Sequence, residues 1–208
     1  MTDSPARLAA VILTGGTGMR LGGVDKAAVQ VEGRTMLERA LEATAAADPV
    51  VVVGPECPTS RPVTWTREDP PGGGPAAGVM AGLDALPVPA GTVCVLAVDM
   101  PRFTAGTLSR LVAVLDSEPD ADAACLLDAS GRLQWLAGVY RLGPLEAARP
   151  ADRAVEHGMS IRSLVRGLRI AEVASVAEEA HDVDTWDDLA GLTDLGTWDA
   201  PKPLRPTE

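Results

Sequence analysis

Residues 8–26, LAAVILTGGTGMRLGGVDK, join an apolar run of strand length to a loop that is rich in glycine. The run from Leu8 to Leu13 predicts a buried strand. The loop after it contains glycines at 15, 16, 18, 22 and 23, and the cations Arg20 and Lys26. Glycine lets a backbone approach a ligand closely, and both cations suit phosphate oxygens. The stretch therefore predicts a strand feeding a phosphate-binding loop, in preference to a plain tight turn.

Two common glycine motifs are excluded. A Walker A loop ends in Gly-Lys-Ser/Thr, and the chain contains no Gly-Lys dipeptide. A dinucleotide fingerprint read from Gly16-x-Gly18 would need a third glycine at position 21, where Leu21 stands. The loop is therefore of a third kind, which ends at Lys26.

The composition limits which binding partners the protein can have and in which cellular compartment we expect it. The chain has 208 residues, the size of one α/β domain, and a net charge of −11. This charge argues against nucleic acid and anionic membrane as partners, but a few local cations with Mg²⁺ could still hold a nucleotide. The three cysteines form no C-x-x-C pair, and no signal pattern or membrane-length apolar run is present. We therefore expect a cytoplasmic protein without a zinc site.

Strand-like and helix-like segments alternate along the chain up to residue 116. This alternation predicts an α/β fold, a Rossmann-like three-layer sandwich with a mostly parallel sheet. A hairpin-like pattern at 121–140 predicts some antiparallel pairing in the C-terminal half. We expect one domain over residues 1–192 and a loosely ordered tail over 193–208. The expected strands are 8–13, 50–53, 63–66, 92–98, 121–127, 134–140 and 168–173, and the expected helices include 36–47, 76–86, 105–115 and 161–166.

Asp99 follows the strongest predicted strand, 92–98. A carboxylate at the carboxyl end of a buried parallel strand is a common metal or ligand group in α/β enzymes. The alternative is a helix N-cap, but the next helical pattern begins near Thr104. A strand order of 3-2-1-4 would place the glycine loop and Asp99 in one crevice at the topological switch point. The sequence thus outlines a Mg²⁺–nucleotide site.

The motif from Leu13 to Lys26 resembles the L-x-G-G…R-x-G-x-D-K signature of the MobA-like nucleotidyltransferases, and especially of molybdenum cofactor guanylyltransferases. Three further segments match in order: GPAAG at 74–78, VDMP at 98–101 and DVDTWDDL at 182–189. The resemblance covers residues 8–192. It implies a Mg²⁺-dependent transfer of GMP from GTP to the phosphate of molybdopterin, with release of pyrophosphate. It also implies transient contact with molybdoenzymes or their chaperones.

The resemblance assigns roles by position. Arg20 and Lys26 would contact phosphates, Asp99 would hold Mg²⁺, and Arg20, Lys26 and Asp99 together would form the catalytic set. Asp69 would contact the nucleoside, and Asp184 would be a second metal or substrate contact. Further nucleotide contacts fall at Leu13, Thr14, Gly15, Gly16 and Gly54.

The sequence departs from the family pattern at three places. Thr14 replaces a frequent alanine, Gly54 replaces a frequent Asn or Asp, and DVDTW at 182–186 replaces N-x-N-T-P. These differences leave the base open between GTP and CTP, and the acceptor open between molybdopterin and another small phosphate. The aspartates of 181–189 could equally form a solvated helix cap. A regulatory nucleotide-binding module is a further alternative, which the retention of Arg20, Lys26 and Asp99 disfavours.

Overall fold

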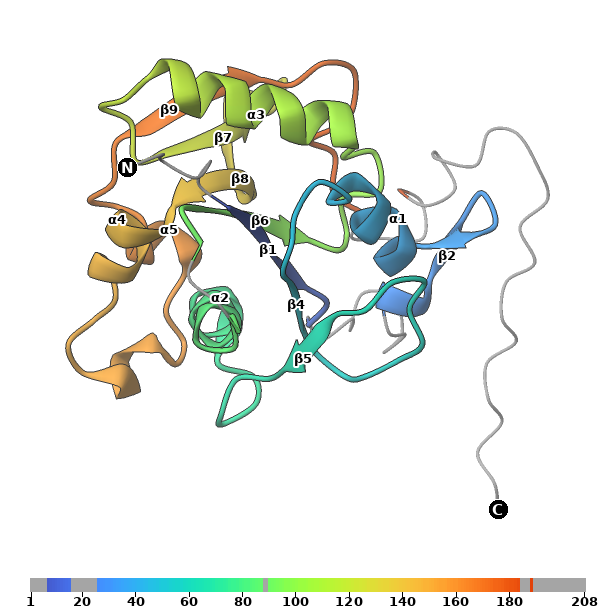
Figure 1. Ribbon diagram of the computed structural model, residues 1–208, viewed down its shortest axis with the longest axis horizontal. Coiled ribbons are helices and arrows are strands. Elements are labelled where there is room, and N and C mark those ends of the chain that lie inside the picture. Colours follow the sequence, from blue (N-terminus) through green and yellow to red (C-terminus); the bar gives the residue numbers. More distant parts are fainter. Residues whose placement is uncertain (1–6, 16–25, 88–89, 184–187, 189–208) are drawn as a thin grey trace, which may run out of the picture.

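A seven-stranded sheet in the order β5-β4-β1-β6-β8-β7-β9 forms the centre of the protein (Figure 1). The computed structural model describes residues 7–15, 26–87, 90–183 and 188. Strand β8 pairs antiparallel with β6 and β7, whereas the other pairs in this sheet are parallel. The predicted mostly parallel sheet with antiparallel pairing in the C-terminal half is confirmed. The strands are β1 (Leu8–Leu13), β4 (Val50–Val53), β5 (Thr64–Thr66), β6 (Thr92–Ala97), β7 (Ala123–Leu127), β8 (Leu133–Arg141) and β9 (Ile170–Ala174).

The central strands β1, β4 and β6 are almost entirely buried, which explains their continuous apolar sequences. The register pairs Leu13 with Val53 on one side and with Ala97 on the other. The three strands therefore end at the same level of one edge, which we call the carboxyl edge. The predicted order 3-2-1-4 corresponds to β5-β4-β1-β6 and is confirmed.

Helices cover both faces of the sheet and complete three layers (Figure 1). Helices α1 (Met36–Ala43) and α3 (Ala105–Ser117) pack on the face that carries Ile12 and Leu96. Helices α2 (Gly74–Asp84), α4 (Leu142–Ala147) and α5 (Ile161–Leu164) pack on the opposite face. Between β1 and α1 the chain forms the short helix η2 (Lys26–Ala28) and a hairpin of β2 (Gln30–Val31) and β3 (Arg34–Thr35). A second short helix, η3 (Arg153–Glu156), lies between α4 and α5. No helix in the described part of the chain has the length and apolar character needed to cross a membrane.

Several helices differ from the sequence prediction. Helix α2 spans 74–84 instead of 76–86, α3 ends at 117 instead of 115, and α5 ends at 164 instead of 166. The pattern predicts that helix α1 reaches residue 47, but the helix ends at Ala43. Beyond Thr44 the backbone changes to turn-type i→i−3 bonds, with the Ala45 N–H donating to Glu42 and the Ala47 N–H donating to Thr44. Helix α4 is absent from the prediction, because Pro144 indicates an interruption. Pro144 lies in the first turn of α4, where a missing N–H has no partner to lose. The predicted tail, 193–208, lies outside the described residues.

Helix α2 lies unusually close to β1, and two glycines allow this approach. A Cβ on Gly82 would lie 2.4 Å from Cγ1 of Val11, and a Cβ on Gly78 would lie 3.3 Å from Cδ2 of Leu13. Both glycines are one helical turn apart and so face the same strand. This contact sets the distance of the middle and C-terminal part of α2 from β1.

Candidate active site

Lys26 and Asp99 meet at the carboxyl edge of the two central strands. Lys26 begins η2, and Asp99 stands two residues beyond the end of β6. The Lys26 Nζ donates to Asp99 Oδ2 at 2.9 Å, and the two side chains are 12% and 24% exposed. Since β1 and β6 are adjacent, the chain that leaves β1 can return a cation to the end of β6. The pair forms a partly shielded charged cluster that a ligand could still reach.

Asp99 does not cap the helix that follows it, so the N-cap alternative is wrong. The N-cap of α3 is Thr104, whose hydroxyl accepts the backbone N–H of Thr107 at 3.2 Å. The Thr107 hydroxyl also receives the backbone N–H of Thr104, which completes a reciprocal capping box. The Asp99 carboxylate is thus directed to Lys26 and not to helix α3.

The C-terminal part of the chain also reaches this site. The backbone N–H of Val183 donates to the backbone carbonyl of Asp99 at 2.8 Å, and the Val183 side chain is fully buried. Asp182, next to it, is exposed. The sequence reasoning indicates the aspartates of this segment but misses Val183, whose signal is a lone apolar residue among acidic ones. Asp184 lies outside the described residues.

The end of β1 is anchored by backbone and hydroxyl groups. Both the backbone N–H and the hydroxyl of Thr14 donate to the carbonyl of Val53, each at 3.0 Å, and Thr14 is buried. The Leu13 carbonyl accepts from the N–H of Val98. Gly15 is exposed, with open space around the position of a Cβ. The predicted contacts Gly16 and Arg20 fall outside the described residues.

Gly54 is in direct contact with Thr14, so two of the departures from the family signature lie side by side. A Cβ on Gly54 would lie only 1.9 Å from Thr14 Oγ1. The φ angle of Gly54 is +155°, a backbone conformation that residues other than glycine rarely adopt. The hydroxyl of Thr14 thus fills the space that a side chain at position 54 would need.

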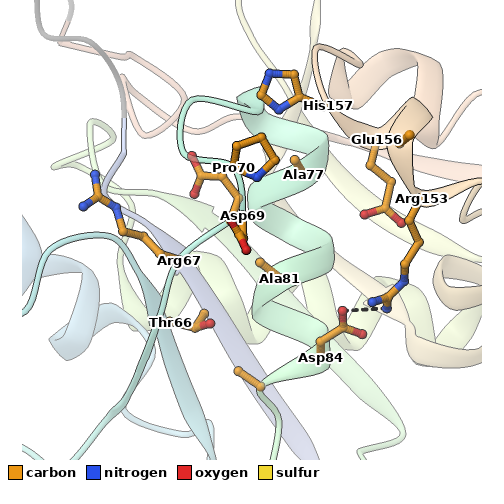
Figure 2. Close-up of a pocket in the computed structure, with 13 residues that line it drawn as sticks. Thr66, Arg67, Asp69, Pro70, Ala77, Ala81, Asp84, Arg153, Glu156 and His157 are labelled. Atoms are coloured by element: carbon orange, nitrogen blue, oxygen red, sulfur yellow. Dashed lines mark hydrogen bonds and ion pairs between the residues drawn. The ribbon is translucent and has the colours of Figure 1, made fainter.

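Asp69 is exposed and lines a separate hollow of about 550 Å³ beside α2 (Figure 2). Arg153 faces this hollow from the other side of the helix and donates to Asp84 at 2.7 Å. Within the described ranges, the residues that line the hollow include neither Lys26 nor Asp99. Asp69 follows β5 and so also lies at the carboxyl edge, but the structure does not bring it into the Lys26–Asp99 cluster. The lining residues are Thr66, Arg67, Glu68, Asp69, Pro70, Ala77, Ala81, Asp84, Ala85, Arg153, Ala154, Glu156 and His157.

The donors at the carboxyl edge suit a metal that is shared with a substrate. The described residues contain no group of three or more His, Cys, Asp or Glu side chains arranged to hold an ion. Mg²⁺ commonly takes one or two carboxylates and completes its octahedron with water and substrate phosphates. Asp99, with a hard oxygen donor at a strand end, fits this type of site.

The comparison with protein families decides the class of the protein. Residues 10–173 match the model of the MobA-like NTP transferase domain. The chain belongs to the MobA-like NTP transferase family. The matched range runs from β1 to β9 and contains both Lys26 and Asp99. The predicted family and enzyme class, a nucleotidyltransferase, are confirmed.

Individual relatives agree with this family. A molybdenum cofactor guanylyltransferase of Acidiphilium cryptum is 30% identical over 199 residues, which cover 89% of this chain and 94% of the relative. The structure resembles the molybdopterin-guanine dinucleotide biosynthesis protein A of Archaeoglobus fulgidus, with a TM-score of 0.65, 20% identity and coverage of 88% and 96% of the two chains. It also resembles the 2-C-methyl-D-erythritol 4-phosphate cytidylyltransferase of Thermus thermophilus, with a TM-score of 0.62, 21% identity and coverage of 89% and 97%. At such identities the structural likenesses show the fold alone.

Proposed function

We propose that this MobA-like NTP transferase transfers GMP from GTP to the phosphate of molybdopterin, forming the guanine dinucleotide cofactor and releasing pyrophosphate. The observation that carries the proposal is the ion pair of Asp99, just beyond the end of β6, with Lys26, the first residue of η2 in the segment that follows the adjacent parallel strand β1. The name of the Acidiphilium cryptum relative supports this choice of substrates. Arg20, Gly16 and Asp184 belong to the proposed site by their positions in the motifs.

The chemistry of the reaction matches these residue types. The acceptor phosphate is itself the nucleophile, so no serine, cysteine or histidine nucleophile is required. Negative charge gathers on the α-phosphoryl oxygens and on the departing pyrophosphate, and a fixed ammonium group such as Lys26 stabilises that charge. Mg²⁺, when bound, would neutralise phosphate charge as a Lewis acid. Asp99 would hold this ion and, through its contact with Lys26, orient the ammonium group.

The nucleoside would lie along the same edge. Leu13, Thr14 and Gly15 end β1 beside Gly54, and Gly15 leaves room for close approach of a ligand to the backbone. Asp69 lines the neighbouring hollow, where its carboxylate could accept from the amino group of a base. We assign Asp69 to nucleoside recognition and Lys26 to the phosphates.

The decisive experiment supplies the protein with Mg²⁺, molybdopterin and each of GTP, CTP, ATP and UTP, and measures pyrophosphate release. We expect release with GTP. Release with CTP in place of GTP would instead support a cytidylyltransferase, the alternative that the glycine at position 54 leaves open. Release with another phosphorylated acceptor would change the acceptor assignment. Binding of GTP without turnover of any NTP would support a regulatory module.

Variants of the ion pair test the residue assignments. Lys26→Met and Asp99→Asn remove one charge each and nearly preserve shape, and we expect each to lower the rate on the order of 10²-fold, the scale for loss of one electrostatic stabiliser. The matched control is Arg34→Ala. Arg34 is an exposed cation of the β2–β3 hairpin, and it pairs with Glu42 of helix α1. This control should keep wild-type turnover. Near-normal rates in both ion-pair variants would contradict the assigned site.

The cellular setting is part of the proposal. We propose a cytoplasmic enzyme that meets molybdoenzymes or their chaperones transiently when it delivers product. The net charge of −11 disfavours binding to nucleic acid or to an anionic membrane surface.

A further inference from the structure

Residues 175–183, which we call the strap, follow the last strand and run along the carboxyl edge. The strap begins at Ser175, whose N–H donates to the carbonyl of Leu127 at the end of β7, at 2.9 Å. It ends at Val183, whose N–H donates to the carbonyl of Asp99 at 2.8 Å. Strands β7 and β9 are parallel and finish at this same edge. The strap therefore connects the outer strands of the sheet to the Lys26–Asp99 pair.

One buried carboxylate fixes the strap to helix α3. Glu179 is only 7% exposed and accepts the hydroxyl proton of Thr107 at 2.6 Å. It also accepts from the guanidinium of Arg110, and from the backbone N–H of Val176 at 2.8 Å. Thr107 and Arg110 lie one turn apart on α3, so Glu179 bridges two turns of that helix. A buried carboxylate without such partners would be costly, so this network constrains the position of the strap strongly.

The charge state of Glu179 agrees with this role. Burial alone would raise the pKa of Glu179, but the hydrogen bonds from Thr107, Arg110 and the Val176 amide outweigh it and hold the pKa below its ordinary value. The carboxylate is thus ionised at neutral pH and keeps its acceptor pairs.

The backbone of the strap is held in an unfavourable conformation by the same network. Ala177 has a φ angle of +55°, in the left-handed region that residues with a Cβ seldom occupy. The bond from the Val176 amide to Glu179 closes this turn. Downstream of it, Ala180 and Val183 are buried in the main core. Glu179 therefore sits between a strained turn and the segment that contacts Asp99.

We propose that Glu179 is a positioning residue of the active site: by fixing the strap to α3, it keeps the Val183 N–H on the Asp99 carbonyl and so holds the Asp99 carboxylate in place for Lys26. This inference rests on the proposed function. Glu179 touches no reacting atom in this scheme and acts through Val183 and Asp99.

The test compares Glu179→Ala and Glu179→Gln with the control Asp122→Asn. In the wild type the Thr107 hydroxyl donates to Oε2 of Glu179 and the Val176 N–H donates to Oε1, so the amide of the Glu179→Gln variant would retain an acceptor oxygen for one of these two donors. Asp122 is also a carboxylate with a lowered pKa, because it accepts from the backbone and side chain of Arg169. It stands before β7, at the opposite end of the sheet from Asp99. The three variants thus separate a general loss of stability from a loss of positioning.

Two measurements are made on each folded variant: hydrogen exchange at the Val183 amide, and kcat and KM for the NTP that the wild type uses. In Glu179→Ala we expect faster exchange at Val183 and a fall in kcat of about tenfold or more, the scale for loss of a supporting contact, with KM changed much less. In Glu179→Gln we expect the exchange rate at Val183 and kcat to lie between those of Glu179→Ala and the wild type. Asp122→Asn should leave both at the wild-type value.

Unchanged exchange at Val183 in Glu179→Ala would overturn the inference, because Glu179 would not be holding the strap. Faster exchange with unchanged kcat would also overturn it, since the strap would then be structural only. These outcomes leave the proposed function standing. A wild type that turns over no NTP would refute the proposed function itself, and this inference with it.

Discussion

At the scale of single residues, the contact of Thr14 with Gly54 predicts that neither position can change freely alone. Gly54→Ala would place a methyl group 1.9 Å from Thr14 Oγ1 and would put a Cβ at a φ of +155°. The hydroxyl can move away only by leaving the carbonyl of Val53. We expect Gly54→Ala to lower the free energy of unfolding by about 1–3 kcal/mol, the usual range for overpacking.

Removal of the hydroxyl should relieve part of that cost. Thr14→Ala alone should lose about 1 kcal/mol for one buried hydrogen bond, while the Thr14 backbone N–H still satisfies the Val53 carbonyl. In the double variant the 1.9 Å contact is gone and the Cβ of residue 14, at 3.3 Å, is the nearest atom to the new methyl group, so the loss should be smaller than the sum of the single losses by about 1 kcal/mol. Urea unfolding of the four proteins measures this coupling. Additive losses would show that the two positions act independently.

Some residue contacts follow from sequence and others do not. The strand order and the two strand ends that the sequence pattern predicts place the loop after β1 and Asp99 at one edge, and the contact of Lys26 with Asp99 agrees with that placement. The contact of Val183 with Asp99 and the burial of Glu179 do not follow, because they depend on the path of an irregular segment across the sheet edge. An acidic residue in a polar stretch resembles a solvated one until its partners on α3 are known.

At the scale of elements, the close approach of α2 to β1 predicts that a Gly→Ala substitution in α2 destabilises the protein, although the same change usually stabilises a helix. In a helix interior, Gly→Ala usually stabilises by up to about 1 kcal/mol. At Gly82 the new methyl group would lie 2.4 Å from Val11 Cγ1, on a fully buried strand that has little room to move. We expect Gly82→Ala to destabilise the protein by about 1–3 kcal/mol.

The control is Gly106→Ala in α3. There the nearest atom to a new Cβ is Thr104 Oγ1, at 3.5 Å, an ordinary van der Waals distance. Gly106→Ala should therefore be neutral or stabilising, and thermal unfolding of both variants measures the difference. Equal effects of the two substitutions would mean that α2 adjusts its distance from the sheet without cost.

Element prediction from sequence succeeds where burial makes the pattern continuous. Strands such as β4 and β6 are apolar throughout because both faces are covered. Helix α4 escapes prediction because it is six residues long and contains a proline, although the first turn tolerates it. The packing distance of α2 is not visible either, since a glycine in a helix pattern looks the same whether it faces solvent or a strand.

At the scale of the whole molecule, the ionisable groups predict how stability changes with pH. Hydrogen bonds to Arg169 lower the pKa of Asp122, and hydrogen bonds to Ser130 and Arg132 lower the pKa of Asp128. The pKa of Glu179 is lowered too, despite its burial. A carboxylate whose pKa is lower in the folded state than in the unfolded state adds stability above the unfolded value. That stability is lost as the pH falls through the folded pKa.

The ordinary pKa values of these groups are 3.8 for the two aspartates and 4.5 for the glutamate, so the loss should begin near pH 4.5 and deepen below 3.8. Between pH 7 and that range the net charge of −11 has the opposite effect on stability. Protonation there makes the charge less negative, and this weakens the repulsion among like charges in the folded protein. We therefore expect the urea midpoint to change little or rise slightly from pH 7 to about pH 5, and then to fall steeply. Glu179→Gln carries no ionisable group at that position, so its midpoint should fall less over the acid range than that of the wild type. A wild-type midpoint that stays constant from pH 5 to pH 3 would show that these three carboxylates do not couple protonation to folding.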